Sequence, residues 1–101
     1  MIVEYTRYRI PEDQREGFVK TYEQAAAYLE ASPHCMAYEL THCREEKDRY
    51  VLRIEWKSEE EHLQGFRKEP GFKDFFRLVQ LYVSNIEEMQ HYELTDVVHR
   101  P

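Results

Sequence analysis

Apolar side chains recur at every second position in three segments of the chain, residues 2–10, 35–44 and 49–56. This period predicts β-strands, because successive side chains of a strand point to opposite faces of a sheet. Residues 82–95 should form a fourth strand, whose less regular alternation indicates a β-bulge near Ile86–Glu88. The polar turn at residues 45–48 is short, so the strands on either side of it should pair as a hairpin.

Two other segments have the three- and four-residue spacing of amphipathic helices. The first begins at Pro11 and ends at Ser32-Pro33, and its apolar face consists of Phe18, Tyr22, Ala25, Ala26 and Leu29. The second follows Ser58-Glu59-Glu60-Glu61, which has the pattern of a capping box, and should run to about Lys68. Pro70-Gly71 interrupts this helix, and a second amphipathic helix should follow, with Phe72, Phe75, Phe76 and Val79 on its apolar face.

The resulting order, β-α-β-β-α-β, predicts a ferredoxin-like α+β fold in which both helices cover one face of a four-stranded antiparallel sheet. The other face would expose apolar residues such as Val3 and Val51 beside Arg53, Glu39 and Glu55. We expect a second copy of the chain to cover this mixed face, which predicts a homodimer packed sheet against sheet. A single domain should span residues 1–101, with a core at about 2–95 and a loose C-terminal tail.

Composition narrows the range of partners. The 101 residues include 20 acidic and 14 basic side chains, for a net charge of −6. No Lys/Arg cluster occurs, so nucleic acid is not an expected partner. No apolar run is long enough to span a bilayer, and the N-terminus lacks the basic start and apolar core of a signal peptide. We therefore expect a cytoplasmic protein without a membrane partner.

Several aromatic and titratable side chains are candidates for a site. With eight Tyr and five Phe, either the core is aromatic or some rings line a pocket. Trp56, the only Trp, ends the third predicted strand, and Tyr38 shares a strand face with apolar residues. The candidate substrate-binding residues are Tyr38, Trp56, Phe66, Phe72 and Phe76. For each of them, plain core packing is the alternative.

Two histidines are candidate catalytic residues. His62 follows the capping box on a helix whose inner side should face the sheet, and an imidazole titrates near neutral pH. It could accept a proton from a phenolic substrate, or it could be a surface histidine on an acidic helix. His42 lies on the same strand face as Tyr38, where it could enter the interior or be a hydrogen-bonded core group.

No metal or cofactor is expected. The five histidines show no HxH or HxxxH spacing, no CxxC occurs, and three glycines do not supply a phosphate-binding loop.

The stretch Glu55-Trp56-Lys57-Ser58-Glu59-Glu60, the helix to Phe66, and Pro70-Gly71-Phe72-Lys73-Asp74-Phe75 resemble the antibiotic biosynthesis monooxygenase family. The resemblance covers roughly residues 1–95 and implies a dimeric α+β barrel. It also implies oxygenase chemistry on phenol- or quinol-like substrates without metal or flavin. Haem-degrading relatives resemble one another in an Asn, a Trp and a His. This chain has Thr6, Trp56 and Phe66 near those positions, so haem degradation is not predicted.

The leading hypothesis is therefore a cofactor-independent monooxygenase that binds a small aromatic molecule in a pocket between the sheet and the helices. The alternative is a non-catalytic dimeric module that binds a small ligand or a protein partner. Haem binding is a third, weaker option.

Overall fold

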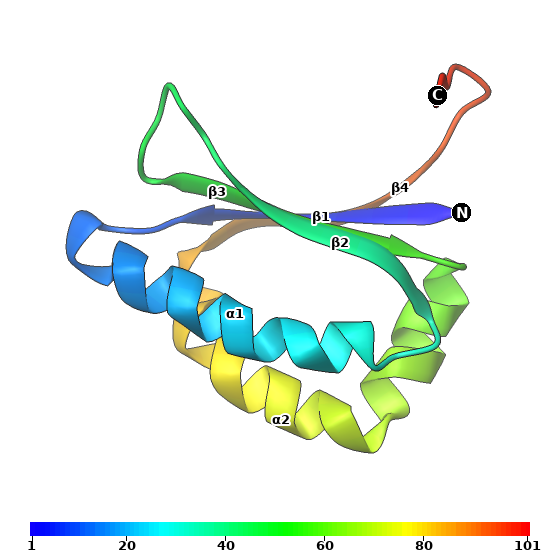
Figure 1. Cartoon of the computed structure of the whole chain (residues 1–101), viewed down its shortest axis with the longest axis horizontal. Helices are drawn as coiled ribbons and strands as arrows, with labels where there is room; N and C mark the ends of the chain where they lie inside the picture. Colours follow the sequence, from blue (N-terminus) through cyan, green and yellow to red (C-terminus); the bar gives the residue numbers. More distant parts are fainter.

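The structure, a computed structural model, describes all residues 1–101 and has two layers, a sheet and the helices that cover one of its faces (Figure 1). Its strands are β1 (Ile2–Arg9), β2 (Cys35–His42), β3 (Arg49–Trp56) and β4 (Ile86–Glu93). The helices are α1 (Arg15–Glu30) and α2 (Pro70–Val79), with a π-helical segment η2 (Glu61–Gly65) and 3₁₀ turns η1 (Glu12–Gln14), η3 (Phe66–Lys68) and η4 (Gln80–Asn85). None of these helices is long and apolar enough to cross a membrane.

The sheet has the order β2-β3-β1-β4, and every neighbouring pair is antiparallel. This confirms the ferredoxin-like α+β fold that the alternation of apolar segments predicts. The expected bulge is also present, because Arg7 pairs with Glu88 whereas Tyr8 pairs with Ile86, which leaves Glu87 unpaired. The last strand begins at Ile86 and not at residue 82, since residues 80–85 form the turn η4.

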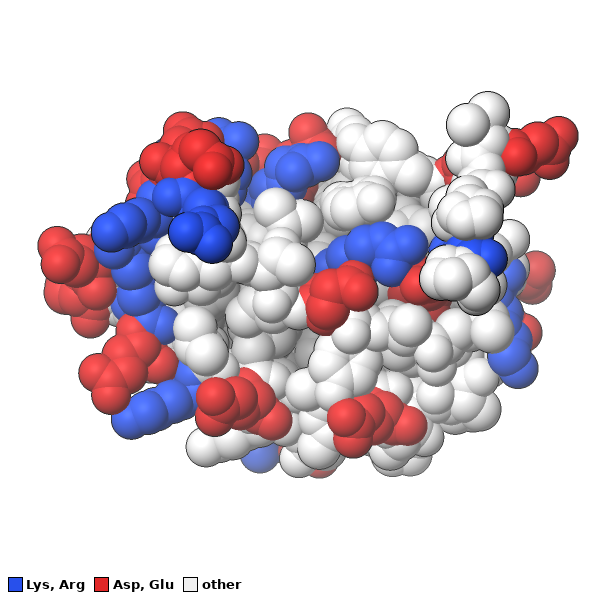
Figure 2. All heavy atoms as spheres, turned by 45° about the horizontal axis from the view of Figure 1, so that its top comes forward, with Lys and Arg blue, Asp and Glu red and all other residues white.

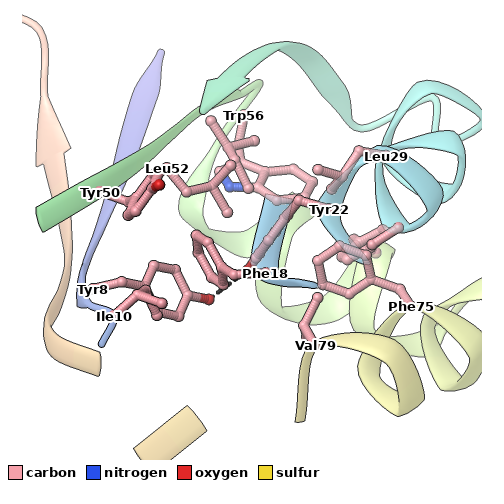
Figure 3. Close-up of a cluster of buried hydrophobic side chains, with 13 residues drawn as sticks. Tyr8, Ile10, Phe18, Tyr22, Leu29, Tyr50, Leu52, Trp56, Phe75 and Val79 are labelled. Atoms are coloured by element: carbon pink, nitrogen blue, oxygen red, sulfur yellow. Dashed lines mark hydrogen bonds between the residues drawn. The ribbon is translucent and has the colours of Figure 1, made fainter. Parts of the chain in front are cut away.

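The core lies between the sheet and the two helices, and aromatic rings dominate it (Figure 3). Phe18 of α1 is fully buried and packs edge-on against Tyr8, Tyr22 and Tyr82. Burial of one such side chain contributes about 1.5–3 kcal/mol to folding. The helix-facing positions of β1 also include two polar residues, Glu4 and Thr6, which are as buried as the apolar ones.

The segment after β3 differs from the regular helix that its sequence predicts. Ser58 does act as a cap, because its Oγ accepts the Glu61 N–H at 3.0 Å. The Glu61 carboxylate does not complete the capping box, however, and instead lies 3.4 Å from Nδ1 of His34. The chain then forms the π-helical segment η2 and the turn η3 in place of an α-helix running to Lys68. Pro70 starts α2 at its first position, as predicted.

Candidate functional site

A pocket of about 300 Å³ lies between the sheet and the helices, at the lower end of the size range of ligand sites. The strands β1, β3 and β4 form one wall, and α2 with the neighbouring turns forms the other. Most of the lining is apolar, and its aromatic members are Tyr8, Tyr22, Trp56, Phe66, Phe72, Phe75 and Phe76. Such a lining suits a small ligand with a large apolar surface.

Part of the rim of the pocket is apolar. Phe76, Val83 and Met89 line the pocket and are nevertheless 45%, 45% and 43% exposed. They come from α2, η4 and β4, and the exposed Arg67 of η3 adds a positive charge to the lining.

Glu4 supplies a carboxyl group to the inner wall of the pocket. The residue is 2% exposed, and the indole N–H of Trp56 donates a hydrogen bond to its Oε1 at 3.0 Å. No protein group donates to the second oxygen, Oε2. Burial raises the pKa of the Glu4 carboxyl above its ordinary value, and the Trp56 hydrogen bond and the charges of His91 and Arg67 only partly oppose this.

His62 lies beside Glu4 and is held flat against Trp56. The two rings are stacked at 4.4 Å with an interplanar angle of 7°. The Nε2 atom of His62 is 3.6 Å from Oε1 of Glu4, and its Nδ1 atom is 2.6 Å from Nε2 of His91. Burial, with smaller contributions from Arg67 and His91, lowers the pKa of His62 to about 3. At neutral pH His62 is therefore an uncharged imidazole.

The π-helical segment η2 carries His62 and is fixed by contacts with the loop after α1. Ser32 donates a hydrogen bond to Glu69 at 2.7 Å, and His34 lies between Glu61 and Glu69. A Cβ atom on Gly65 would lie only 2.6 Å from Nε2 of His34, so any larger residue here would force the His34 ring to move. Short π-helical segments are frequent at functional sites.

A pair of tyrosines adds hydroxyl groups to the pocket, whose polar lining also includes Thr6 and Arg67. The hydroxyl groups of Tyr8 and Tyr22 share a hydrogen bond, and both side chains are buried (Figure 3). Burial raises the pKa of Tyr8 to about 12 and raises that of Tyr22 as well. Both phenols are therefore neutral at physiological pH. One hydroxyl donates to the other, and the hydroxyl that accepts keeps its own O–H for a ligand.

Comparison with known proteins places the chain among relatives. The sequence model described as "Antibiotic biosynthesis monooxygenase" matches residues 1–78. The chain belongs to this family. The match confirms the resemblance carried by Trp56, Ser58 and the Pro70-Gly71 break. Membership supports a general monooxygenase-like or small-molecule-binding role, which agrees with an apolar pocket that contains a few polar groups.

Individual relatives agree with this assignment. The chain is 25% identical over 93 residues to the uncharacterized protein YczJ of Bacillus subtilis, a match that covers 92% of this chain and 98% of the relative. A Bordetella bronchiseptica protein provisionally named an antibiotic biosynthesis monooxygenase shares the fold, with a TM-score of 0.76 at 21% identity, over 93% of this chain and 96% of that one. A conserved protein from Methanosarcina mazei shares the fold with a TM-score of 0.75 at 16% identity, over 93% of this chain and 92% of that one.

Within this antibiotic biosynthesis monooxygenase fold, five of the seven predicted site residues lie around the pocket. They are Trp56, His62, Phe66, Phe72 and Phe76. Tyr38 and His42 lie outside it, because they belong to the edge strand β2 whereas the pocket lies under β3, β1 and β4. The hydroxyl of Tyr38 donates to Glu30 at 2.5 Å. His42 is exposed, stacks on Tyr50, and its Nε2 lies 2.7 Å from the Lys47 carbonyl oxygen.

The sequence interpretation missed the carboxyl group and its second neighbour. Glu4 falls on the helix-facing side of the first predicted strand, and a carboxylate among core positions was the available indication. For His91, the alternation of the last strand indicated only that His91 and Tyr92 point to opposite faces, so that at most one of them enters the pocket. Its position opposite Glu4 depends on how β1 pairs with β4.

Glu4, His62 and His91 also form a group of metal-ligating types, whose ligand atoms lie within 4.8 Å of one another. Sequence spacing could not show it, since the residues come from three separate elements. Two nitrogens bound to one tetrahedral ion at 2.0–2.1 Å would be about 3.4 Å apart. The observed 2.6 Å between the two rings is a hydrogen-bond distance, and His62 directs different nitrogens toward Glu4 and His91. The group is thus arranged as a row, in which the His62–His91 contact is a hydrogen bond and Glu4 lies 3.6 Å from the other nitrogen of His62.

Proposed function

We propose that the protein is a cofactor-independent monooxygenase that oxidises a small phenol or quinol bound in the pocket, with Glu4 as the base. The observation that carries this proposal is a buried carboxyl group of raised pKa with one free oxygen in a mostly apolar pocket rich in aromatic rings. Family membership supports the reaction class.

Glu4 is a better candidate base than His62, to which the sequence assigned this role. Proton transfer is most efficient when the pKa of the base lies near the working pH, so a raised carboxyl pKa favours removal of a phenolic proton. An imidazole whose pKa is lowered to about 3 accepts a proton poorly. On this view His62 and Trp56 position Glu4, and they close its side of the pocket to water.

The phenolate or enolate formed in this way can transfer one electron to O₂. Recombination of the resulting substrate radical with superoxide forms a carbon–oxygen bond and gives a peroxide. The peroxide anion then loses hydroxide, whose hydrogen comes from the C–H bond of the same carbon, and a quinone carbonyl remains. The hydroxide leaves with the product, and the proton that Glu4 removed from the substrate has to be released separately before the next turnover. The protein supplies orientation, desolvation and proton transfer, while the substrate supplies the electrons.

Oxygen uptake with a panel of hydroquinones and anthrones tests the proposal on protein treated with a chelator. We expect wild-type turnover and a loss of about 10²–10⁴-fold in kcat for Glu4→Gln, the range typical of a lost general base. Glu60→Gln removes an exposed carboxylate nearby and serves as the matched control. Absence of wild-type turnover across the panel would refute the proposal.

The apolar lining also favours the alternative of a module that binds a small ligand without converting it. Native mass spectrometry of protein purified from its host distinguishes the two. A retained aromatic molecule that remains unchanged in the presence of oxygen would favour the binding module.

We further propose that a second copy of the chain covers the open face of the sheet. On that face apolar side chains alternate with charged ones (Figure 2). Arg53 pairs there with Glu39 at 3.3 Å and with Glu55 at 2.9 Å, so its charge is already satisfied within the chain. Sedimentation velocity should give twice the mass of the chain, and Val51→Asp should shift the protein to monomer. A monomeric wild type at 100 μM, about the upper range of such measurements, would refute the dimer.

A further inference from the structure

We propose that His62, His91 and Glu59 form a proton relay that connects Glu4 with solvent. The inference rests on the proposed role of Glu4 as a base and deepens it, because a buried base must return its proton to water between turnovers.

The four side chains lie in a row from the pocket to the surface. Oε1 of Glu4 is 3.6 Å from Nε2 of His62, Nδ1 of His62 is 2.6 Å from Nε2 of His91, and Nδ1 of His91 is 3.9 Å from Oε1 of Glu59. Exposure of the side chains rises along the row, from 3% and 5% to 20% and 59%. Each imidazole thus presents one nitrogen inward and the other outward.

Such an arrangement conducts a proton without holding a charge on the buried ring. His62 accepts the proton of Glu4 at Nε2 while its Nδ1–H moves to Nε2 of His91. His91 in turn releases its own Nδ1–H toward Glu59 or water. One proton enters and one leaves, and the stable species at each end of the transfer are neutral imidazoles.

The surroundings of His62 favour this transfer over storage of the proton. Arg67 from η3 and His91 from β4 are the basic groups that act on His62, and both oppose its protonation. Trp56 covers one face of the His62 ring, so the transfer needs only an in-plane movement of a few tenths of an ångström to bring Nε2, now 3.6 Å from Oε1 of Glu4, within hydrogen-bond distance. The other route, through the mouth of the pocket, passes Phe76, Val83 and Met89, which offer no proton acceptor.

Kinetics of three variants test the relay. We expect His91→Ala to lower kcat at least about tenfold, which is less than the roughly 10²–10⁴-fold loss for the base itself because water can partly replace a relay, with KM unchanged. Added imidazole should restore its turnover in proportion to concentration, whereas wild type should not respond. Glu59→Gln should show a smaller loss, and the exposed His99→Ala and Glu60→Gln should behave as wild type. A fully active His91→Ala, or one that imidazole fails to rescue, would overturn the relay.

Nitrogen-15 NMR of the histidines tests the same connection without any substrate. We expect a proton shared between Nδ1 of His62 and Nε2 of His91, visible as a coupling across the hydrogen bond, and its loss in His91→Ala. No shared proton in wild type, or zinc bound between the rings in purified protein, would overturn the relay. If no phenol is oxidised, the proposed function fails in the assay, while the spectrum still decides whether the connection exists.

Discussion

Two histidines stack on aromatic residues at opposite ends of β3, but they differ in burial and in their polar neighbours. His62 stacks on Trp56 at 4.4 Å, and His42 stacks on Tyr50 at 4.2 Å, both with nearly parallel rings. His62 is 4% exposed and lies between Glu4 and His91. His42 is exposed beside the hairpin turn, and only a backbone carbonyl approaches its Nε2.

The difference shows that depth and neighbours, not the aromatic contact, decide what each imidazole can do. Burial removes water from His62 and lowers its pKa to about 3, which makes it a neutral link between two hydrogen-bonding groups. At the other end of β3, water remains available to His42, and no second titratable side chain lies within ion-pair distance of it.

Replacing the stacking partner of the buried histidine should have the largest effect. Trp56 is fully buried, so Trp56→Ala should lower the free energy of unfolding by about 3–5 kcal/mol, as large core truncations do. Urea denaturation followed by circular dichroism measures the loss. Tyr50→Phe, which keeps the ring under His42, is the control and should cost less than about 1.5 kcal/mol. A loss below about 1 kcal/mol for Trp56→Ala would contradict the packing.

The packing of η2, the segment that carries His62, can be tested by a substitution at its contact with His34. In Gly65→Ala the new methyl would lie 2.6 Å from Nε2 of His34, so the His34 ring must move away from Glu61 and Glu69. We expect a loss of about 1–3 kcal/mol in thermal or urea denaturation, the usual cost of overpacking. The double variant with His34→Ala should recover part of it. If Gly65→Ala alone is as stable as wild type, the close contact does not hold η2 in place.

The order and type of most elements could be predicted because the sequence patterns that indicate them involve neighbouring residues. Alternation in β1, β2 and β3, the short turn at residues 45–48 and the break at Pro70 each depend on neighbouring residues alone. Even the bulge at Glu87 left a trace in the irregular alternation of the last strand. The π-helical segment left none, because a Ser-x-x-Glu pattern suits an α-helix equally well. Whether this segment is π-helical depends on the contact of the Glu61 carboxylate with His34, which is a tertiary contact.

The site was harder to predict for the same reason. Trp56, His62 and Phe66 follow one another in the chain, and their approach to the pocket could be expected from the helix spacing. Glu4 and His91 are 87 residues apart in the sequence. They reach the site only because the register of β1 with β4 places them opposite each other. His42 could not be excluded, because strand alternation gives the face of a sheet and not the position under it at which a pocket forms.

The free energy of unfolding should fall at acid pH because His62 is buried as a neutral ring. The pKa of His62 is lowered to about 3 in the folded protein, so the unfolded chain binds its proton first as the pH falls below about 6.5. Stability from this group is therefore present at neutral pH and is lost between about pH 6.5 and 3, by at most about 1.4 kcal/mol per pH unit. The raised pKa of Glu4 has the opposite sign, since its stabilising effect disappears as the pH rises through the folded value.

Denaturation curves at half-unit pH intervals measure this dependence. His62→Gln should flatten the acid limb relative to wild type, and Glu4→Gln should leave that limb steep. An acid limb of the same slope in wild type and His62→Gln would show that His62 is hydrated in solution.

The smallest effect is expected at the exposed histidine. His42→Ala removes a stacked ring on Tyr50 and one hydrogen bond to the Lys47 carbonyl, both in contact with water, so the loss in unfolding free energy should be about 0.5–1 kcal/mol. Oxygen uptake should stay within about twofold of wild type, because the ring lies outside the pocket that holds Glu4. A drop in kcat as large as that of Glu4→Gln would move the chemistry to the other end of β3. The contrast between two stacked histidines would then need a different explanation from burial.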